Sequence, residues 1–567
     1  MYILGIWDNV GSGVALLNDN RIVFAVNEEI YTKQKFEYKF PENSIKAALK
    51  YCNIKASDID QIVFSGIDPF FTASRVMPNK MDNYYKFIMK SSDIPNHLSK
   101  KQFLYYKFQN LNPSFMCMNL TKGRIKGRLK HMNFNNFNLH FVNHQAAHAA
   151  YAAFTSPFNK CLSITLDDFG DGISASVYIL DNLKFEKVGE IKKRNSIGLF
   201  LNEASNILGL NNFLGMGGLD ELSNYSYPYS FDDNKLQSLF DSQGTGIFAK
   251  YNLKKQYTFL RDIAWKNSRE RFAYDVQQEI EYVISKFISS CIDRYGIGDV
   301  VLSGNLVSNM SLNRRIRNLE NLKHWYIPPN SGDGGIALGE ALYLNYEINS
   351  KTKYRFSPNL GQEYTEDAIL DASKLYKLRI EKENIEDQAA HAAELINSGN
   401  YILWYQGRQD YDQKSLGSRS IFAPSKNIET LRRLNLDIKR NEWFRTFPVS
   451  ILKDSVDDLV NYDNKGDAQY GNMDYLLKEN HYDDLKAVSR IDKSSVVQTI
   501  DKNNNLGLLL KSIKKDSGYG AVLNTDLSFS NSTIVNDPSD AFYLMRMSNA
   551  KYMFINGFTV MRNSGNS

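Results

Sequence analysis

Two histidines placed four residues apart are the first side chains in the sequence that could do metal chemistry. His144 and His148 stand in the segment Asn143–Ala150, which is rich in alanine. On a helix this spacing puts both imidazoles on one face, where they can bind a single ion. The same spacing also arises by chance in ordinary core or surface helices. The pair therefore suggests a metal site and needs further ligands to support it.

Carboxylates at two other points could supply those ligands. Asp167 and Asp168 follow the predicted strand Cys161–Leu166 in a glycine-rich turn, and Asp333 lies in a glycine-rich loop before a predicted helix. Ligands bind at the carboxyl ends of strands in open α/β sheets, so the first two aspartates are well placed. Asp333 has an alternative interpretation as the N-cap of the following helix. Two imidazoles and two carboxylates form a site suited to iron, manganese or zinc.

Strands that alternate with helices must position these ligands. Hydrophobic patterning predicts an N-terminal β-hairpin over 2–26, a helix after Pro41, and a long helix over 270–294 that leads into a buried strand. The other predicted elements of this half are the histidine helix, a helix at 335–345, and strands at 61–64, 139–142, 161–166 and 300–304. The alternation predicts an α/β architecture in which helices cover the sheets.

The length predicts more than one domain. A chain of 567 residues exceeds the size at which a single hydrophobic core keeps growing. The polar stretch Asn349–Lys353 suggests a linker, and beyond it a helix at 389–397 and strands at 401–405 and 520–523 indicate a second, smaller α/β domain. We therefore expect a first domain over 1–350, a linker over 351–358, and a second domain over 359–567.

Composition and charge disfavour several classes of function. Hydrophobic residues at 43% and charged residues at 23% are ordinary for a soluble globular protein. A net charge of +5 is too mild to support nucleic-acid binding. We expect neither a signal peptide nor a membrane span, because no stretch approaches the roughly 20 apolar residues that a span requires. The four cysteines lack CxxC spacing, so we expect a reducing, cytoplasmic location.

One basic run departs from the regular pattern. From about 72 to 133 the periodicity loosens, and in Lys122–Lys130 a lysine or arginine occupies every second position. Charge runs are usually solvated helix faces, which favours a surface helical insertion here. The alternative interpretation is a patch that binds an anionic substrate or a membrane surface.

Motifs of the first half resemble the O-carbamoyltransferases of nodulation-factor and cephamycin biosynthesis. The matching segments are 143–150, 166–171, 303–309 with Asn313, and 328–339. The resemblance implies an actin-like, two-lobed N-terminal domain with the metal ligands His144, His148, Asp167 and Asp333. It also implies nucleotide or cofactor binding by Asp168, Gly170, Gly304, Asn305 and Asn309.

The second half is similar to the YrdC-like module of the same family. The matching segments are 405–409, 416–421 and 434–440 with Glu442, Phe444 and Arg445. The resemblance implies that carbamoyl phosphate and ATP, with Mg, form carbamoyl adenylate there. The implied catalytic residues are Arg408, Arg419, Lys439 and Arg445, and the implied co-substrate ligands are Lys414, Ser420 and Asn524. Cationic side chains and a hydroxyl can bind phosphate oxygens. If the motifs did not occur in the same order as in the family, the preferred interpretation of these basic residues would be surface ion pairs.

Several positions depart from the family pattern. Val10 and Gly11 stand where the family has a histidine and an aspartate, so proton removal from an acceptor would need another base. The segment Asn211–Leu219 lacks the family's lysine, and Lys414 replaces an arginine, which forfeits a bidentate contact. Further departures lie at 28–30, 490–498 and 524–528.

One hypothesis and two alternatives follow. We expect an enzyme that transfers a carbamoyl group to a hydroxyl of a sugar or secondary-metabolite acceptor, with iron preferred over manganese or zinc. The departures favour the first alternative, a catalytically impaired relative that serves as a nucleotide- or glycan-binding scaffold. The histidine pair and the second domain count against the other alternative, an actin-like kinase or ATPase. Whether the chain forms a homodimer is left open.

Overall fold

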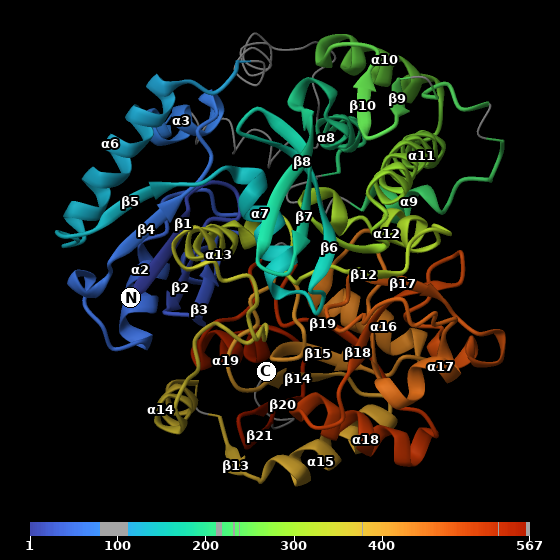
Figure 1. Cartoon of the computed structure of the whole chain (residues 1–567). Coiled ribbons are helices and arrows are strands. Elements are labelled where there is room, and N and C mark those ends of the chain that lie inside the picture. Colours follow the sequence, from blue (N-terminus) through green and yellow to red (C-terminus); the bar gives the residue numbers. More distant parts are fainter. Residues whose placement is uncertain are drawn as a thin grey trace. The chain divides into compact units, whose positions relative to one another are not determined.

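The chain divides into two compact units (Figure 1). The structure is a computed structural model, and it describes residues 1–79, 111–210, 218–230, 233–237, 239–376, 378–530 and 532–562. The first unit comprises Met1–Glu28 and Phe36–Phe356, and the second comprises Glu29–Lys35 and Ser357–Ser567. The segment Glu29–Lys35, which includes helix α1 (Glu29–Thr32), was expected in the first domain from the sequence. Its Lys33 forms an ion pair with Asp540 of the second unit. The domain limits 1–350 and 359–567 themselves stay a prediction.

One sheet of the first unit is built on the N-terminal hairpin. Its strand order is β3-β2-β1-β4-β5, with bounds Arg21–Asn27, Gly13–Asn18, Tyr2–Trp7, Gln61–Phe64 and Asn138–Phe141. β1 pairs antiparallel with β2 and parallel with β4. Asp19 closes the hairpin turn in the left-handed region (φ 51°), which aspartate tolerates. The predicted hairpin and the predicted strand at 61–64 are confirmed.

A second sheet of this unit carries two of the candidate carboxylates. Its order is β12-β11-β6-β7-β8, with bounds His324–Tyr326, Asp299–Ser303, Lys160–Gly170, Ile173–Asp181 and Lys184–Lys192. The predicted strand 161–166 is too short, because β6 continues to Gly170 and turns back into β7. The register shifts between Leu166 and Gly170. Asp167 and Asp168 therefore lie in a bulged stretch, a feature that re-aims side chains.

Two helices connect these sheets to each other. α7 (His144–Thr155) packs on the second sheet, α13 (Ile336–Asn349) packs on the first, and the two helices pack together. All residues of α7 are buried, which its alanines permit. The helix predicted at 335–345 begins after a 3-10 turn at Asp333–Gly335 and runs four residues further than expected.

The other elements of the first unit surround this core. The helix predicted at 270–294 is confirmed as α11 (Arg269–Tyr295), which leads into β11. The remaining elements with α or β labels are α2 (Glu42–Tyr51), α3 (Pro69–Val76), α6 (Phe115–His131), α8 (Ile197–Ile207), α9 (Leu219–Ser223), α10 (Leu253–Lys266), α12 (Met310–Arg317), β9 (Phe240–Gln243) and β10 (Gly246–Ala249).

The second unit contains one nine-stranded sheet, in the order β13-β21-β20-β14-β15-β19-β16-β18-β17. The strand bounds in that order are Ile380–Lys382, Phe558–Met561, Tyr552–Ile555, Ile402–Tyr405, Arg419–Ala423, Ala521–Asp526, Val449–Leu452, Ser494–Ile500 and Met473–Leu476. Its helices are α14 (Glu366–Tyr376), α15 (Ile385–Asn397), α16 (Ile428–Leu434), α17 (Val456–Leu459), α18 (Asn505–Ser517) and α19 (Pro538–Met547). α15 and α18 lie side by side (Figure 1) and form a hydrophobic core with the sheet.

The structure thus has a mixed α/β fold, as the alternation of elements predicted. The actin-like and YrdC-like fold types stay predictions. Within the described parts of the chain, no helix is both long and apolar enough to cross a membrane.

Candidate metal centre and a buried polar cluster

The start of α7 presents the two histidines. Asn143 caps the helix by accepting hydrogen bonds from the backbone N–H groups of Gln145 and Ala146, so the first turn is fixed. His144 and His148 follow one turn apart, with ring centroids 4.8 Å apart, and both side chains are buried. The cap and the spacing therefore hold both imidazoles on one rigid face.

Four predicted ligands come together in the structure. One ligand atom from each of His144, His148, Asp167 and Asp333 lies within 4.8 Å of the others. His144 Nε2 is 3.1 Å from Asp167 Oδ2 and 3.4 Å from Asp333 Oδ1. His148 Nε2 is 3.3 Å from the same Asp333 oxygen. A helix, a bulged strand and a glycine-rich loop thus supply one compact cluster.

Unsatisfied atoms in this cluster fit a cation. His148 Nε2 and Asp333 Oδ1 are buried and have no hydrogen-bond partner among the described residues. Buried polar atoms in folded proteins almost always have partners, so lone pairs that converge without one suit a metal ion. The N-cap alternative for Asp333 is wrong, because neither its 3-10 turn nor α13 has a side-chain cap.

Neighbouring amides hold the carboxylates in place. Gln145 Nε2 donates to Asp167 Oδ2 at 3.1 Å. Asn202 Nδ2 donates to Asp168 Oδ2 at 2.7 Å. The predicted cofactor residue Asn305 accepts from the backbone N–H of Asp333 at 3.1 Å and lies 3.4 Å from Asp168 Oδ2 through its Nδ2. Such supporting contacts orient metal ligands and tune their basicity. Gln145 and Asn202 were missed from the sequence, although Gln145 lies inside the histidine motif.

Charges in the cluster attract positive charge. Burial lowers the pKa of His144, but the nearby carboxylates of Asp167 and Asp333 raise it, and the net pKa lies well above the usual range. Burial raises the pKa of Asp333, yet the two histidines bring it well below the usual range. Burial and the charge of Asp167 raise the pKa of Asp168. A cation can replace the proton on His144, because metal binding deprotonates its ligands.

The remaining predicted residues of the first unit have structural contacts. A side chain at Gly170 would collide with the ring of His144, its Cβ lying 2.1 Å from Cδ2. Gly304 has a φ of 100°, and a Cβ there would lie 2.2 Å from the carbonyl oxygen of Leu166. Asn309 caps α12 and exchanges hydrogen bonds with Gln277. The nucleotide roles of these residues stay predictions.

Basic residues predicted in the second unit have varied partners. The buried Arg419 guanidinium donates to the backbone carbonyls of Gln406, Ser418 and Gly407 at 2.9–3.0 Å. Arg408 donates to the carbonyls of Leu360 and Gly361. The buried Lys439 forms an ion pair with Asp526, and Arg445 Nε lies 3.5 Å from Glu442 Oε2. The alternative interpretation, that these residues form surface ion pairs, therefore holds for Arg445 but not for Arg419, which is buried and bound to backbone carbonyls.

A buried polar cluster crosses four neighbouring strands of the second unit. Asn524 on β19 donates to Ser450 Oγ on β16 and to Gln498 Oε1 on β18, both at 3.0 Å. Ser420 on β15 shares a 2.8 Å hydrogen bond with Ser415. Asn524 Oδ1 is buried and has no hydrogen-bond partner in the described part of the chain. The structure thus brings the predicted Ser420 and Asn524 close through Ser415, whose carbonyl lies 3.5 Å from Asn524 Nδ2.

Comparison with known proteins identifies the family. Residues 2–342 match the family described as carbamoyltransferase N-terminus, and residues 393–562 match carbamoyltransferase C-terminus. The chain belongs to the carbamoyltransferase family.

The sequences of known relatives align with different shares of this carbamoyltransferase. Nodulation protein NolNO of Sinorhizobium fredii is 25% identical and covers 93% of the chain and 75% of its own length. The 3'-hydroxymethylcephem-O-carbamoyltransferase of Streptomyces clavuligerus is 26% identical and covers 42% of the chain and 44% of its own length. Among solved structures, HypF of T. kodakarensis has a TM-score of 0.36 and 12% identity, and it covers 62% of the chain and 49% of itself.

The departures of this carbamoyltransferase from the family pattern occupy distinct places. Val10 follows Trp7 in the loop after β1, where Trp7 Nε1 donates to the Val10 carbonyl at 2.8 Å. The Trp7 ring lies 5.1 Å from the His144 ring, so this loop adjoins the metal cluster. Lys414 lies beside the polar cluster of the second unit, next to Ser415 in the chain. Residues 211–217, which lack the family's lysine, lie outside the described residues.

Proposed function

We propose that this carbamoyltransferase moves a carbamoyl group from carbamoyl phosphate, through carbamoyl adenylate, to a hydroxyl of a sugar or secondary-metabolite acceptor. The convergence of His144, His148, Asp167 and Asp333 with unsatisfied buried atoms carries the proposal. The name of the Streptomyces clavuligerus relative supports a hydroxyl acceptor, since that protein is an O-carbamoyltransferase of a hydroxymethylcephem.

Iron is the proposed metal, with manganese or zinc as the next candidates. Two imidazoles and carboxylate oxygens are the ligand set found in non-haem iron sites, although manganese and zinc also accept it. His144, His148, Asp167 and Asp333 would hold the ion, while Gln145 orients Asp167. A bound cation would supply polarisation of the carbamoyl carbonyl, which stabilises negative charge on its oxygen.

The second unit is the proposed place of carbamoyl activation. Carbamoyl phosphate, ATP with Mg and one water would give carbamoyl adenylate, pyrophosphate and phosphate, which balances all atoms. The predicted residues Arg408, Arg419, Lys439 and Arg445, with Lys414, offer positive charge for phosphate oxygens. Ser420 and Asn524 offer hydrogen bonds from a buried polar cluster. Asn524 Oδ1, which has no partner among the described residues, can accept one from a ligand.

The transfer step needs an acceptor oxygen and a leaving group. The acceptor hydroxyl oxygen forms a bond to the carbamoyl carbon, AMP leaves with the bonding electron pair, and the hydroxyl proton passes to a base. In the first unit, burial of the cluster excludes water from the carbonyl, which limits hydrolysis of the mixed anhydride. The cap at Asn143 and the amides around the carboxylates hold the surrounding groups in fixed positions.

Product analysis tests the proposal. The purified chain, loaded with metal, is incubated with carbamoyl phosphate, ATP, Mg and a panel of hydroxylated metabolites, and products are identified by mass spectrometry. We expect at least one acceptor to gain a carbamoyl group, with pyrophosphate formed in parallel. Calorimetric binding of ATP without turnover on any acceptor would overturn the proposal in favour of a scaffold.

Lys414 offers a second arm of this test. Lysine keeps a positive point charge near phosphate but lacks the planar fork of arginine. Lys414→Arg should therefore leave activity intact or lower the Michaelis constant for carbamoyl phosphate. A loss of activity in this variant would argue that Lys414 does not stand at a phosphate subsite.

A further inference from the structure

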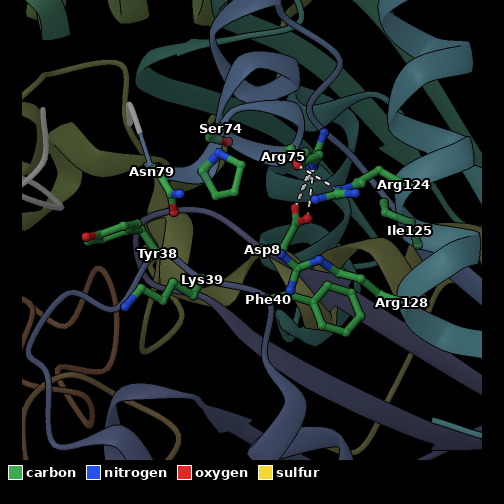
Figure 2. A pocket seen from close by; sticks show the side chains of 11 residues that line it. Asp8, Tyr38, Lys39, Phe40, Ser74, Arg75, Asn79, Arg124, Ile125 and Arg128 are labelled. Atoms are coloured by element: carbon green, nitrogen blue, oxygen red, sulfur yellow. Dashed lines mark hydrogen bonds and ion pairs between the residues drawn. The ribbon is translucent and has the colours of Figure 1, made fainter. Parts of the chain in front are cut away.

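A cavity of about 230 Å³ opens in the first unit beside the end of β1 (Figure 2). It is lined by Asp8, Tyr38, Lys39, Phe40, Ser74, Arg75, Pro78, Asn79, Arg124, Ile125 and Arg128. These residues come from the loop after β1, the segment before α2, helix α3 and the residues just after it, and helix α6. The volume is below the roughly 300–1,000 Å³ of pockets that bury a drug-sized ligand, so it suits a small molecule or one end of a larger one.

Positive charge dominates the lining of this cavity. Its charged residues are the four cations Lys39, Arg75, Arg124 and Arg128 and the single carboxylate Asp8. Arg75 and Asp8 face each other (Figure 2), with Arg75 Nη2 and Asp8 Oδ1 2.6 Å apart and both side chains buried. This pair offsets the one negative charge of the lining, and Arg128 Nη1 lies 4.0 Å from Oε1 of Glu42, a half-exposed residue outside the lining. The lining residues together therefore keep a net positive charge.

Helix α6 contributes two of those cations from the basic run 122–130. Arg124 and Arg128 lie one turn apart, and Ile125 between them also lines the cavity. Arg124 Nε donates to the backbone carbonyl of Arg75 at 3.2 Å, and the Arg128 guanidinium lies 5.2 Å from the centre of the Phe40 ring. Lys126 and Lys130 of the same run are exposed and do not line the cavity. The structure thus divides the run into a solvated face, as the sequence favoured, and a cavity face.

Residues next to the cavity lining in the chain contact the metal cluster. Trp7, directly before Asp8, has its ring 5.1 Å from that of His144. Phe71 on α3 stacks on His144 at 6.0 Å, and the next turn of α3 carries Ser74 and Arg75. A ligand bound in the cavity is therefore held by the same two elements that wall the proposed transfer site.

We propose that this cavity binds an oxyanion group, a carboxylate or phosphate, of the carbamoyl acceptor. Arginine forks bind such groups through charge-assisted hydrogen bonds, and the side chains of Tyr38 and Phe40 also line the cavity. The assignment to the acceptor rests on the proposed function, in which the phosphates of ATP and carbamoyl phosphate belong to the second unit. The acceptor class is thus narrowed to acidic hydroxylated molecules.

Protection from arginine modification tests the site without turnover. The full chain is treated with phenylglyoxal, and modification of Arg124 and Arg128 is followed by peptide mass spectrometry. Glucuronate and glucose 6-phosphate are compared with glucose at matched ionic strength, and the exposed Arg432 of α16 serves as the reference. We expect the two acidic sugars to slow modification of both cavity arginines severalfold, while glucose has no effect. Equal protection by all three sugars would overturn the site.

Protection by carbamoyl phosphate and ATP, measured in the same way, shows whether the cavity binds the donor substrates or the acceptor. If carbamoyl phosphate or ATP protects Arg124 and Arg128 better than the acidic sugars, the cavity belongs to the donor and the proposal is overturned. Failure of carbamoyl transfer with protection intact would overturn the proposed function and leave the anion site standing. Carbamoyl transfer to neutral acceptors, without protection of the two arginines by acidic sugars, would overturn the anion site and leave the proposed function standing.

A matched pair of double variants separates specific binding from net charge. Arg124→Ala/Arg128→Ala and Lys126→Ala/Lys130→Ala each remove two positive charges from α6. We expect glucose 6-phosphate, measured by calorimetry, to bind about tenfold or more weakly to the arginine variant and unchanged to the lysine variant. Equal losses in both variants would show that only the general charge of α6 matters. Circular dichroism checks that both variants fold.

Discussion

Asp333 and His148 carry the strongest residue-scale argument for a metal ion. His148 Nε2 and Asp333 Oδ1 are buried atoms that lack a hydrogen-bond partner among the described residues, and they lie 3.3 Å apart. A buried polar atom without a hydrogen bond destabilises the folded protein by about 1–3 kcal/mol. Several such atoms in one place therefore indicate that a ligand binds there. A cation bound by all four side chains would remove that cost.

Removal of the histidine pair should therefore remove the metal. His144→Ala/His148→Ala takes away both neutral donors and leaves two carboxylates, so we expect metal content to fall at least about tenfold by elemental mass spectrometry. His324→Ala, an exposed histidine paired with Asp299, is the matched control and should retain the metal. Unchanged metal in the double variant would rule out this cluster as the site.

Arg419 makes a different residue-scale prediction. Its guanidinium donates to three backbone carbonyls in a position that is 1% exposed. Arg419→Ala removes the guanidinium donor from the carbonyls of Gln406 and Gly407, whereas the Ser418 carbonyl keeps its hydrogen bond from the backbone N–H of Gln406. We expect urea denaturation to show a loss on the order of 3 kcal/mol in the unfolding free energy. Arg419→Lys should recover only part, because lysine lacks the fork. An unfolding free energy unchanged by Arg419→Ala would contradict this structural role.

At the scale of the element, helix α11 buries two acidic residues that the predicted chemistry does not use. Burial raises the pKa of Glu279 to about 8 and that of Asp275 to about 7. Glu279 accepts a hydrogen bond from the backbone N–H of Phe240, which only partly offsets the burial. Both groups therefore hold their protons more tightly in the folded chain than in the unfolded one.

This shift makes the stability of the first unit depend on pH. A carboxyl whose folded pKa is raised favours folding most when it is protonated, so stability is highest below the unfolded pKa of 4.5 and falls as the pH rises towards about 8. For Glu279 the change is on the order of a few kcal/mol. We expect the melting temperature to fall between pH 5 and 9, and Glu279→Gln to reduce that slope. The exposed control Glu320→Gln should keep the parent slope, and an unchanged slope in Glu279→Gln would contradict the prediction.

At the scale of the whole molecule, the two units contain separate polar centres. The first unit holds the histidine–aspartate cluster, and the second holds the buried polar cluster around Asn524. If activation and transfer are divided between them, damage to one centre should leave the reaction of the other intact.

Two variants test that division. His144→Ala/His148→Ala should lose carbamoyl transfer yet keep carbamoyl phosphate-dependent exchange of pyrophosphate into ATP. Asn524→Ala should lose most of that exchange and keep its metal, because it removes hydrogen bonds to Ser450 and Gln498 only in the second unit. Asn549→Ala, an exposed asparagine of the same unit, should retain both activities. Loss of exchange in the histidine variant would place activation in the first unit.

Local patterns in the sequence predicted several of the elements and named the four candidate metal ligands. A four-residue spacing specifies one helix face, and runs of alternating or helically spaced apolar residues specify strands and helices, so α7, the N-terminal hairpin and α11 could be predicted. These features depend on backbone geometry over a few residues, which is encoded next to where it acts. The turn predicted at Asp167 is instead a bulged part of β6.

Only the tertiary structure decided which partner each polar side chain has. Asn202 reaches Asp168, Arg419 turns onto backbone carbonyls, and Asn524 meets Gln498 across neighbouring strands. The basic run likewise acquired a cavity face only when Phe40 and Arg75 packed against α6. Such contacts join residues far apart in the chain, so they depend on strand order and helix packing that no local spacing specifies.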